Sequence, residues 1–404
     1  MIIVNAMQWM TTAQAAHRLG VRPQTLYAYV SRGLLNSRRD ALGRESRFDS
    51  HEVERLALRG RPRQASRSRS LEIQIETSIT EISDHTIRFR GHDIVELSRT
   101  ATLEMVAELI WTGTLPDTSP LWSGRAIELD RGDTIADRVR LIAAHAAVGA
   151  IHAFDEATVT TEARRLIATL ADSLPVAGSG RCPRVVLADG TAVRGSIAGR
   201  LWARLTPRRA TPQLMAVMNA ALVMLADHEM ATSTLAARVA ASSRADLHGV
   251  VAAGMGALSG TLHGGESTRC RRILTLAQAR PLDEVIDISL ERYGRLPGFG
   301  QVLYPRGDPR AAHLLTLLRS GEAHPVLDQV EHIIDAARRR HLPSPNVDLA
   351  LAAFGLVAAM PIDAGEAIFT TARIAGWVAH ALEEYAERPL RFRPRAMYVG
   401  PSGP

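Results

Sequence analysis

The sequence predicts a mainly α-helical protein that consists of a small basic N-terminal domain and a much larger all-α body. From residue 71 onward, apolar residues recur mostly at helical spacing, with few alternating runs. Before that point, residues 60–70 (GRPRQASRSRS) contain no large apolar residue, which is typical of a solvated linker. A chain of 404 residues, 46% hydrophobic and 22% charged, is long enough for two or three globular domains.

The N-terminal domain, residues 1–59, begins with a helix-turn-helix pattern. Thr11 and Gln14 have the spacing of a capping box, and the apolar residues of Ala15–Leu19 follow on one helical face. Pro23 suits the first turn of a second helix that ends near Val30 and turns Leu26 and Val30 inward. We expect a basic wing over residues 32–48 and a third helix over residues 49–58.

Charge is concentrated in this first segment. Residues 1–70 hold 13 arginines and 5 acidic residues, whereas the rest of the chain holds 35 basic and 37 acidic residues. A basic module on a nearly neutral body favours binding to a polyanion.

The stretch TTAQAAHRLGVRPQTLYAYVSRGLL resembles the winged helix-turn-helix of MerR-type and excisionase-type proteins, over about residues 8–58. The resemblance implies a second helix in the major groove of duplex DNA and a wing on the phosphate backbone. The alternative is a helical protein-interaction domain whose arginines reflect codon usage. The predicted DNA contacts are Arg22, Gln24, Thr25, Tyr29, Arg44 and Arg47.

Several classes of protein are excluded by residue usage. The chain has no lysine, so no Schiff-base lysine and no Walker A lysine is available. Its two cysteines, Cys182 and Cys270, have no CxxC partner, and no histidine or carboxylate pair has metal-ligand spacing, so we expect neither disulfides nor a metal site. No apolar stretch approaches the ~20 residues that span a bilayer, and we expect a cytoplasmic protein.

The body opens with a short polar β-like piece, a helix and a Gly-Thr-Leu-Pro turn. Helical periodicity then continues to the C-terminal region. The clearest helical segments are Met105–Ile110, Ala136–Ile151, Leu214–Ala226, Asp246–Leu258 and Ile368–Leu382.

Four blocks of sequence in the body are informative when taken in order. They are LADHEM with the later TLHGG, LPGFGQVLYPRGDPRA, NVDLALAAFG, and TTARIAGWVAHALEEYAERP. In this order and spacing they resemble citrate synthase, from about residue 75 to the end. The resemblance implies a large domain (residues 71–270 and 345–404), a small domain (residues 271–344), and a homodimer.

The resemblance also implies a Claisen condensation, in which an acyl-CoA is deprotonated and its enol attacks the ketone of oxaloacetate. Asp348 would be the base, and His263 would donate a hydrogen bond to the thioester oxygen. On its own, Asp348 at a helix start would be interpreted as an N-cap and His263 as a turn residue. A coenzyme A thioester would be the co-substrate, with no tightly bound cofactor.

Carboxylate binding would use arginines, whose planar fork suits bidentate contacts. On the family pattern these are Arg310, Arg373 and Arg388, the last reaching into the neighbouring subunit, and His228 would also contact oxaloacetate. The loop Leu296, Pro297, Gly298, Phe299 and Gly300 would contact the adenine of coenzyme A through its backbone.

One residue departs from the family pattern. Gln301 occupies the position of the histidine that donates to the keto oxygen. An amide can donate a hydrogen bond but cannot be cationic. Two functions therefore stay open: a citrate synthase-type acyltransferase using acetyl-CoA or propionyl-CoA, with activity weakened by Gln301, or a DNA-binding regulator whose degenerate body senses a dicarboxylate or an acyl-CoA.

Overall fold

The computed structural model describes residues 9–39, 46–50, 52–53, 56, 74–83, 86–130, 134–178, 180–304, 307–321, 323–394 and 400. The chain divides into two compact units, Met1–Gln74 and Ile75–Pro404. The predicted linker and Arg44 lie outside the described residues.

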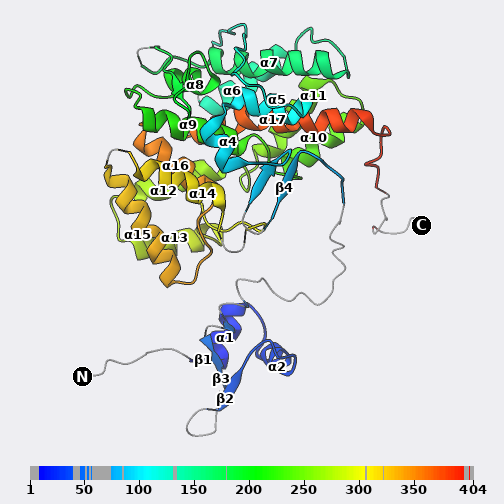
Figure 1. Ribbon diagram of the computed structural model, residues 1–404. Coiled ribbons are helices and arrows are strands. Elements are labelled where there is room, and N and C mark those ends of the chain that lie inside the picture. The colour runs from blue at the N-terminus through cyan, green and yellow to red at the C-terminus, as the bar shows by residue number, and fades with distance from the viewer. Residues whose placement is uncertain are drawn as a thin grey trace. The chain divides into compact units, whose positions relative to one another are not determined.

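The N-terminal unit is a helix pair on a three-stranded antiparallel sheet (Figure 1). Its elements are β1 (Trp9–Thr11), α1 (Thr12–Leu19), α2 (Pro23–Ser31), β2 (Ser37–Arg39) and β3 (Ser46–Asp49), with sheet order β1-β3-β2. The predicted capping box is confirmed: the Thr11 amide donates to Gln14 Oε1 at 3.0 Å, and the Gln14 amide donates to Thr11 Oγ1 at 3.1 Å. Of the expected third helix, the described residues 50, 52, 53 and 56 are helical.

The core of this unit corrects one prediction. Tyr29 was expected on the free face of α2, but its side chain is only 3% exposed and packs with Leu26 and Phe48, whereas Val30 is only partly buried. Leu26 and Tyr29 are three residues apart and share a helical face, so the larger aromatic ring fills the core in place of valine. Tyr29 is therefore not available for a DNA contact.

The second unit is a helical body with two small antiparallel sheets. The strands are β4 (Thr80–Ile82), β5 (Ile87–Phe89), β6 (His92–Asp93), β7 (Val185–Val186) and β8 (Ala192–Val193). The helices of the first half are α4 (Ile94–Thr100), α5 (Leu103–Thr112), α6 (Ile135–Ala146), α7 (Glu156–Ser173), α8 (Ile197–Leu205), α9 (Pro212–Leu225), α10 (Thr232–Ser242) and α11 (Leu247–Leu258). Those of the second half are α12 (Glu266–Leu276), α13 (Leu282–Tyr293), α14 (Pro309–Arg319), α15 (Pro325–Arg339), α16 (Val347–Val357) and α17 (Ala364–Ala386).

Each predicted body helix is present, but one ends earlier than expected. The segment predicted as Ala136–Ile151 ends at Ala146 in α6, because Gly149 follows with a φ of +76° that a helix does not accommodate.

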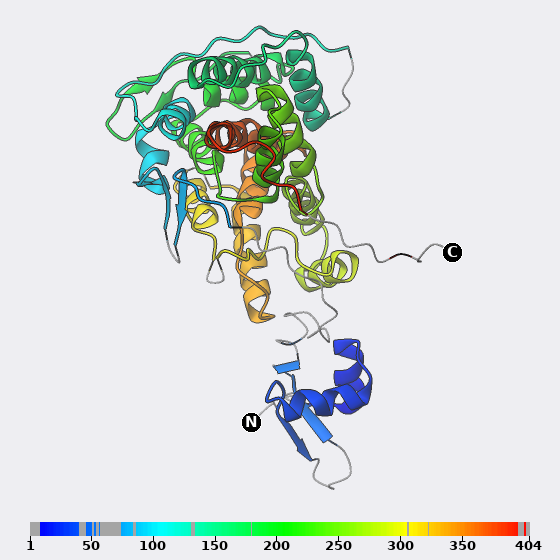
Figure 2. The ribbon, with the colours of Figure 1, turned by 90° about the vertical axis from the view of Figure 1, so that its right-hand side faces the viewer.

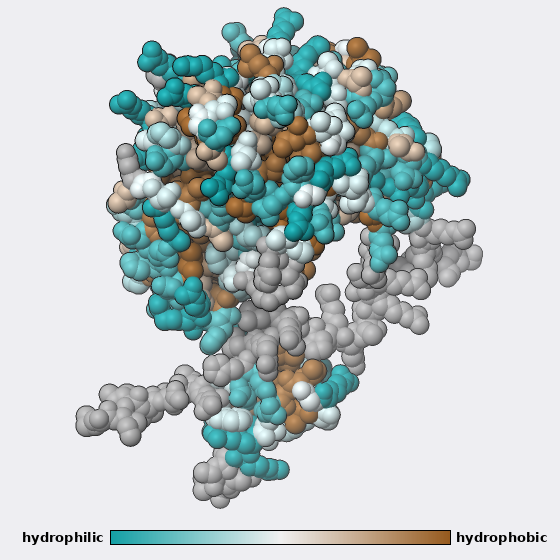
Figure 3. All heavy atoms as spheres, viewed as in Figure 1, coloured by the Kyte–Doolittle hydropathy of each residue, from teal (hydrophilic) through white to brown (hydrophobic). Residues whose placement is uncertain are grey.

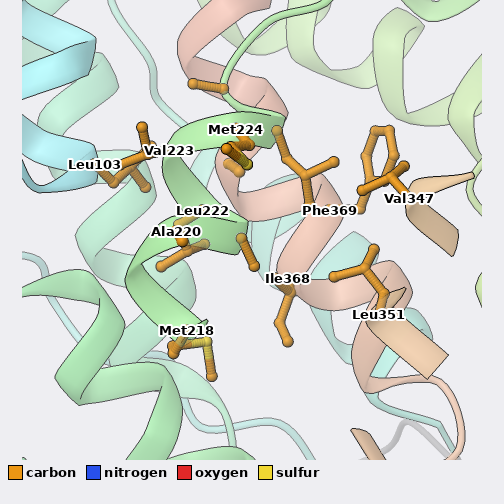
Figure 4. Close-up of a cluster of buried hydrophobic side chains, with 14 of the residues drawn as sticks. Leu103, Met218, Ala220, Leu222, Val223, Met224, Val347, Leu351, Ile368 and Phe369 are labelled. Carbon is orange, nitrogen blue, oxygen red and sulfur yellow. The ribbon is translucent and has the colours of Figure 1, made fainter. Parts of the chain in front are cut away.

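Helix α17 lies in the interior of the body, with other helices around it in both ribbon views (Figures 1 and 2). It packs against α9, α10 and α11, and all of its residues from Ala367 to Ala381 are buried. Figure 4 shows Met218 and Leu222 of α9 near Ile368 of α17 and Leu351 of α16. At Gly376 a Cβ would lie 2.5 Å from the Ala226 carbonyl oxygen, so only glycine allows the end of α9 to approach α17 this closely.

The helices α12, α13 and α15 pack together, and α14 packs between α9 and α16. In Figure 1 this yellow and orange group lies on one side of the body. The predicted boundaries of the large and small domains stay a prediction.

The face seen in Figure 3 is mostly hydrophilic. No helix in the described part of the chain is long and apolar enough to cross a membrane.

Candidate active site

The segment before α14 holds a buried arginine in place. Asp308 caps α14, and its carboxylate accepts two bonds from the Arg310 guanidinium, from Nε at 3.0 Å and from Nη2 at 2.8 Å. The carboxylate also accepts from the Arg310 backbone amide at 3.0 Å and from the Val347 amide at the start of α16, at 3.1 Å. Asp308 therefore fixes Arg310, which is 2% exposed, beside the first turn of α16.

Arg373 is the second buried cation of the site. It lies on α17, is 1% exposed, and donates from Nε to the Leu225 carbonyl at 2.9 Å. Both terminal nitrogens, Nη1 and Nη2, are buried without a hydrogen-bond partner among the described residues. Burial lowers its pKa to about 10. A cation with two unused buried donors is suited to receive a carboxylate from a ligand.

His228 and Tyr304 meet next to these cations. His228 follows the end of α9, and its Nε2 lies 2.7 Å from the Tyr304 hydroxyl. The Arg310 guanidinium carbon lies 5.7 Å from the centre of the Tyr304 ring. Burial, together with the charges of Arg310 and Arg373, holds the pKa of His228 well below its usual value, so this imidazole is neutral at pH 7.

His263 lies in the turn that leads into α12. Its Nε2 is 2.9 Å from the Ser233 hydroxyl of α10, and its ring meets Phe369 of α17 edge to face at 5.8 Å. Burial, and then the charge of Arg373, lowers the pKa of His263 to about 4. If Ser233 donates to Nε2, the Nδ1 proton of this neutral imidazole is free for a ligand oxygen.

Asp348 lies in the first turn of α16 but does not cap it. The cap is Asn346, whose side-chain oxygen accepts from the Asp348 amide at 3.0 Å, so the interpretation of Asp348 as an N-cap is wrong. Asp348 Oδ1 is buried without a partner among the described residues. Burial first, and then the negative charge of Glu266, raises the pKa of Asp348 from 3.8 to about 7. Such a carboxylate can accept a proton at neutral pH.

The glycine-rich loop Leu296–Gly300 lies between α12 and α16. Glu266 Oε1 accepts from the Gly298 amide at 3.2 Å, and Gly298 and Gly300 bond to Asn346 and Ser344 across a short bridge. At Gly298, φ is +82° and a Cβ would lie 2.5 Å from Cys270 Sγ, so only glycine fits. Residues 296–299 are buried, and a nucleotide contact of this loop stays a prediction.

The structure thus brings most of the predicted residues together, with two exceptions. Arg310, Arg373 and His228 form one group, and the charges of Glu266 and Arg310 both act on Asp348. Arg388 is exposed beyond the end of α17, in a segment held to α10 by the bond from the Leu390 amide to the Ser242 carbonyl at 2.8 Å. Gln301 is partly exposed at the start of a turn.

Sequence reasoning missed four residues of this site: Ser233, Glu266, Tyr304 and Asp308. Asp308 could have been found, because it precedes Pro309 and Arg310 in a capping position. The other three carry no local signal, because each meets its partner only through the fold. The separation along the sequence is 30 residues for Ser233 and His263, 32 for Glu266 and Gly298, and 76 for Tyr304 and His228.

In the N-terminal unit, a separate set of side chains is exposed. Arg22 and Gln24 at the start of α2 are exposed, and Thr25 and Arg47 are partly exposed. On the sheet, the guanidinium of Arg38 lies 4.0 Å from the centre of the Trp9 ring.

A carboxyl with a raised pKa, two neutral imidazoles and two buried guanidiniums in a mainly α-helical body are groups suited to an enzyme that accepts a proton and binds a carboxylate substrate. The family "Citrate synthase, C-terminal domain" matches residues 72–395, and "Helix-turn-helix domain" matches residues 9–61. The chain belongs to the citrate synthase family and carries an N-terminal helix-turn-helix domain. The reaction that this family supports is condensation of an acyl-CoA with oxaloacetate, with the coenzyme A thioester as co-substrate.

Individual relatives agree with the family match. Citrate synthase of Haloferax volcanii is 30% identical over 340 residues, covering 77% of this chain and 88% of that protein. Citrate synthase 2 of Bacillus subtilis is 28% identical over 362 residues, covering 83% and 96%. Citrate synthase from Pyrobaculum aerophilum superposes with a TM-score of 0.60 at 26% identity, over 82% of this chain and 91% of that one.

A further solved structure is a ternary complex of carboxymethyl coenzyme A and oxaloacetate with citrate synthase from Thermoplasma acidophilum. It superposes with a TM-score of 0.65 at 23% identity, over 83% of this chain and 96% of that one, and thereby shows the same fold.

Proposed function

We propose that this chain condenses acetyl-CoA, or a short homologue such as propionyl-CoA, with oxaloacetate to give citrate or 2-methylcitrate and free coenzyme A. The observation that carries the proposal is Asp348, a partly buried carboxyl with a pKa of about 7 and an unpartnered oxygen, placed beside the Asp308–Arg310 pair. The experiment is a thiol-release assay on the purified protein with oxaloacetate and a panel of acyl-CoAs. Absence of thiol release with every acyl-CoA would contradict the proposal.

In this mechanism Asp348 accepts the proton from the carbon next to the thioester. His263, neutral at pH 7, donates to the thioester oxygen and stabilises the enol. The two buried guanidiniums, Arg310 and Arg373, hold the carboxylates of oxaloacetate, and His228 lies beside them. The enol carbon then bonds to the keto carbon, and hydrolysis of the resulting thioester releases coenzyme A.

Gln301 is expected to limit the rate of this reaction. Replacement by histidine (Gln301→His) should raise turnover by about 10- to 100-fold with smaller changes in KM, because an imidazole stabilises charge on the keto oxygen better than an amide. The measurement is kcat and KM with acetyl-CoA and oxaloacetate.

The matched control is Val302→His, which adds an imidazole at a neighbouring side chain that is 93% exposed. It should leave turnover unchanged. Absence of turnover in both Gln301→His and the wild-type chain, with both substrates still bound, would favour the regulator that senses these ligands. Equal, measurable turnover would show that Gln301 does not limit the reaction.

A second function, DNA binding by the N-terminal domain, is favoured by its excess of arginine and by the exposed start of α2. The full chain should bind duplex DNA with an affinity that falls steeply between 50 and 200 mM salt, values at which about 10³- to 10⁵-fold losses are typical. Substituting Arg22, Arg38 and Arg47 together by alanine should weaken binding and reduce the salt slope by about 3, or about 1 per phosphate contact.

The control for this measurement replaces three exposed arginines of the body, Arg184, Arg194 and Arg209, by alanine. It removes the same charge from the chain and should leave the affinity for duplex DNA, measured by fluorescence anisotropy titration, unchanged. Equal weakening by both triple variants would show that net charge, and not the helix-turn-helix domain, binds DNA.

We further propose a homodimer in which Arg388 serves the partner's site. Arg388 is exposed, and Leu262, next to His263, is 78% exposed, as expected where a second chain covers this region. An inactive Asp348→Ala chain and an inactive Arg388→Ala chain, refolded together, should recover one competent site per mixed dimer. Subunit exchange without recovered activity would show that each site is built from one chain.

A further inference from the structure

We propose that the Tyr304 hydroxyl donates the hydrogen bond to the keto oxygen of the oxo acid that the missing histidine would otherwise supply. This inference rests on the proposed function, because it names a catalytic residue for that reaction. Tyr304 lies in the block LPGFGQVLYPRGDPRA, where the sequence alone assigned it no role.

The position of Tyr304 is the first argument. Its side chain is 3% exposed, and its hydroxyl lies 2.7 Å from His228 Nε2. The charges of Arg310 and Arg373 both act on its phenol. The hydroxyl therefore lies beside His228, Arg310 and Arg373, which are proposed to hold oxaloacetate. A donor to the keto group is required at this place.

The turn from Gln301 to Tyr304 explains why Tyr304, and not Gln301, reaches the site. The Tyr304 amide donates to the Gln301 carbonyl at 3.1 Å, and the two residues between them, Val302 and Leu303, are 93% and 42% exposed. The turn thus buries Tyr304 while Gln301 stays at the partly exposed entrance.

The hydroxyl is also in a suitable protonation state. Burial raises the pKa of Tyr304, so the phenol keeps its proton at neutral pH. His228 is neutral, and when its Nε2 carries the proton it donates to the tyrosine oxygen. The Tyr304 O–H is then free to donate to the ligand. The hydrogen bond that its oxygen accepts from His228 makes this O–H a stronger donor. Negative charge that develops on the keto oxygen is favoured by the two nearby guanidiniums.

The first test needs no turnover. Oxaloacetate labelled with ¹³C at its keto carbon is bound to the full-length protein, and the chemical shift of that carbon is measured by NMR. Donation by Tyr304 polarises the carbonyl, so the signal of the bound ligand should lie downfield in the wild-type chain and return toward the value of free oxaloacetate in Tyr304→Phe. The control, Tyr385→Phe, removes another hydroxyl that donates to a backbone carbonyl, that of Ala245 at 2.7 Å, and should not move the signal.

The second test uses kinetics. Tyr304→Phe should lower kcat by about 100-fold, with a smaller effect on the KM for oxaloacetate, since loss of one such donor typically costs about 10²- to 10³-fold. In the Gln301→His background the same substitution should cost less than about 10-fold, because the imidazole now supplies the donor.

These outcomes separate the inference from the proposed function. An unchanged ¹³C shift in Tyr304→Phe, with the label still bound, would overturn the role of Tyr304 whether or not the protein condenses acyl-CoA. An equal kinetic loss in both backgrounds would also overturn it, because Tyr304 would then act only by positioning His228. A shift that depends on Tyr304 in a protein without thiol release would support the contact and contradict the enzyme function alone.

Discussion

Replacement of Asp348 by asparagine should lower thiol release from acyl-CoA by about 10³-fold or more while oxaloacetate still binds. Asparagine has nearly the same shape but cannot accept the proton, and general base catalysis typically contributes about 10²- to 10⁴-fold. In the wild-type chain kcat/KM should rise with pH through about 7, because the base must be ionised to act. The measurement is thiol release across pH 5 to 9.

Asp348→Asn should lower activity but raise the free energy of unfolding. The native state holds the Asp348 proton up to a pH of about 7, whereas the unfolded chain releases it near 3.8. Between these values the native state binds more protons, so the contribution of Asp348 to the unfolding free energy falls as pH rises. Asp348→Asn removes this loss and should be more stable than the wild-type chain by up to about 4 kcal/mol at pH 8, with a much smaller difference at pH 4.

Urea unfolding of both chains at the two pH values measures this difference. Asp328→Asn is the control, because Asp328 is exposed in the first turn of α15. It should alter neither thiol release nor the pH dependence of stability. Undiminished thiol release in Asp348→Asn would exclude Asp348 as the base.

Arg373→Met should weaken oxaloacetate binding by about 100-fold or more. Its two unpartnered terminal nitrogens are available for a carboxylate, and hydrogen bonds to charged groups contribute about 1.5–3 kcal/mol each. The unfolding free energy should change by only about 1 kcal/mol, because loss of the bond to the Leu225 carbonyl is offset by removal of a buried charge that is incompletely paired.

Arg238→Met is the matched comparison. Arg238 is equally buried, but it is paired with Glu384 at 3.0 Å and Glu383 at 2.7 Å. Its removal takes a cationic partner from the buried Glu384 carboxylate, which among the described residues keeps only Arg391 at 2.6 Å, and should cost about 3 kcal/mol of stability. Calorimetric titration with oxaloacetate and urea unfolding measure both effects. Unchanged oxaloacetate affinity in Arg373→Met would show that the free nitrogens do not hold the substrate.

The sequence by itself determined the features that depend on near neighbours or on ordered motifs. The capping box at Thr11 and Gln14, the helical character of the body, and the citrate synthase blocks are all local patterns, and the structure and the family match confirm them. Local patterns suffice here because helix caps and helical faces are set by residues three or four apart.

Only the tertiary structure decided which side chains share the site and what charge they carry. Tyr29 is buried in a core cluster that also holds Leu26 and Phe48 of β3, which the period of α2 alone does not show. The pKa of Asp348 depends on burial and on Glu266 of another helix, and the contact of His228 with Tyr304 joins residues 76 positions apart. Desolvation and charge act through space, so these properties follow from how the helices pack and not from the order of residues along the chain.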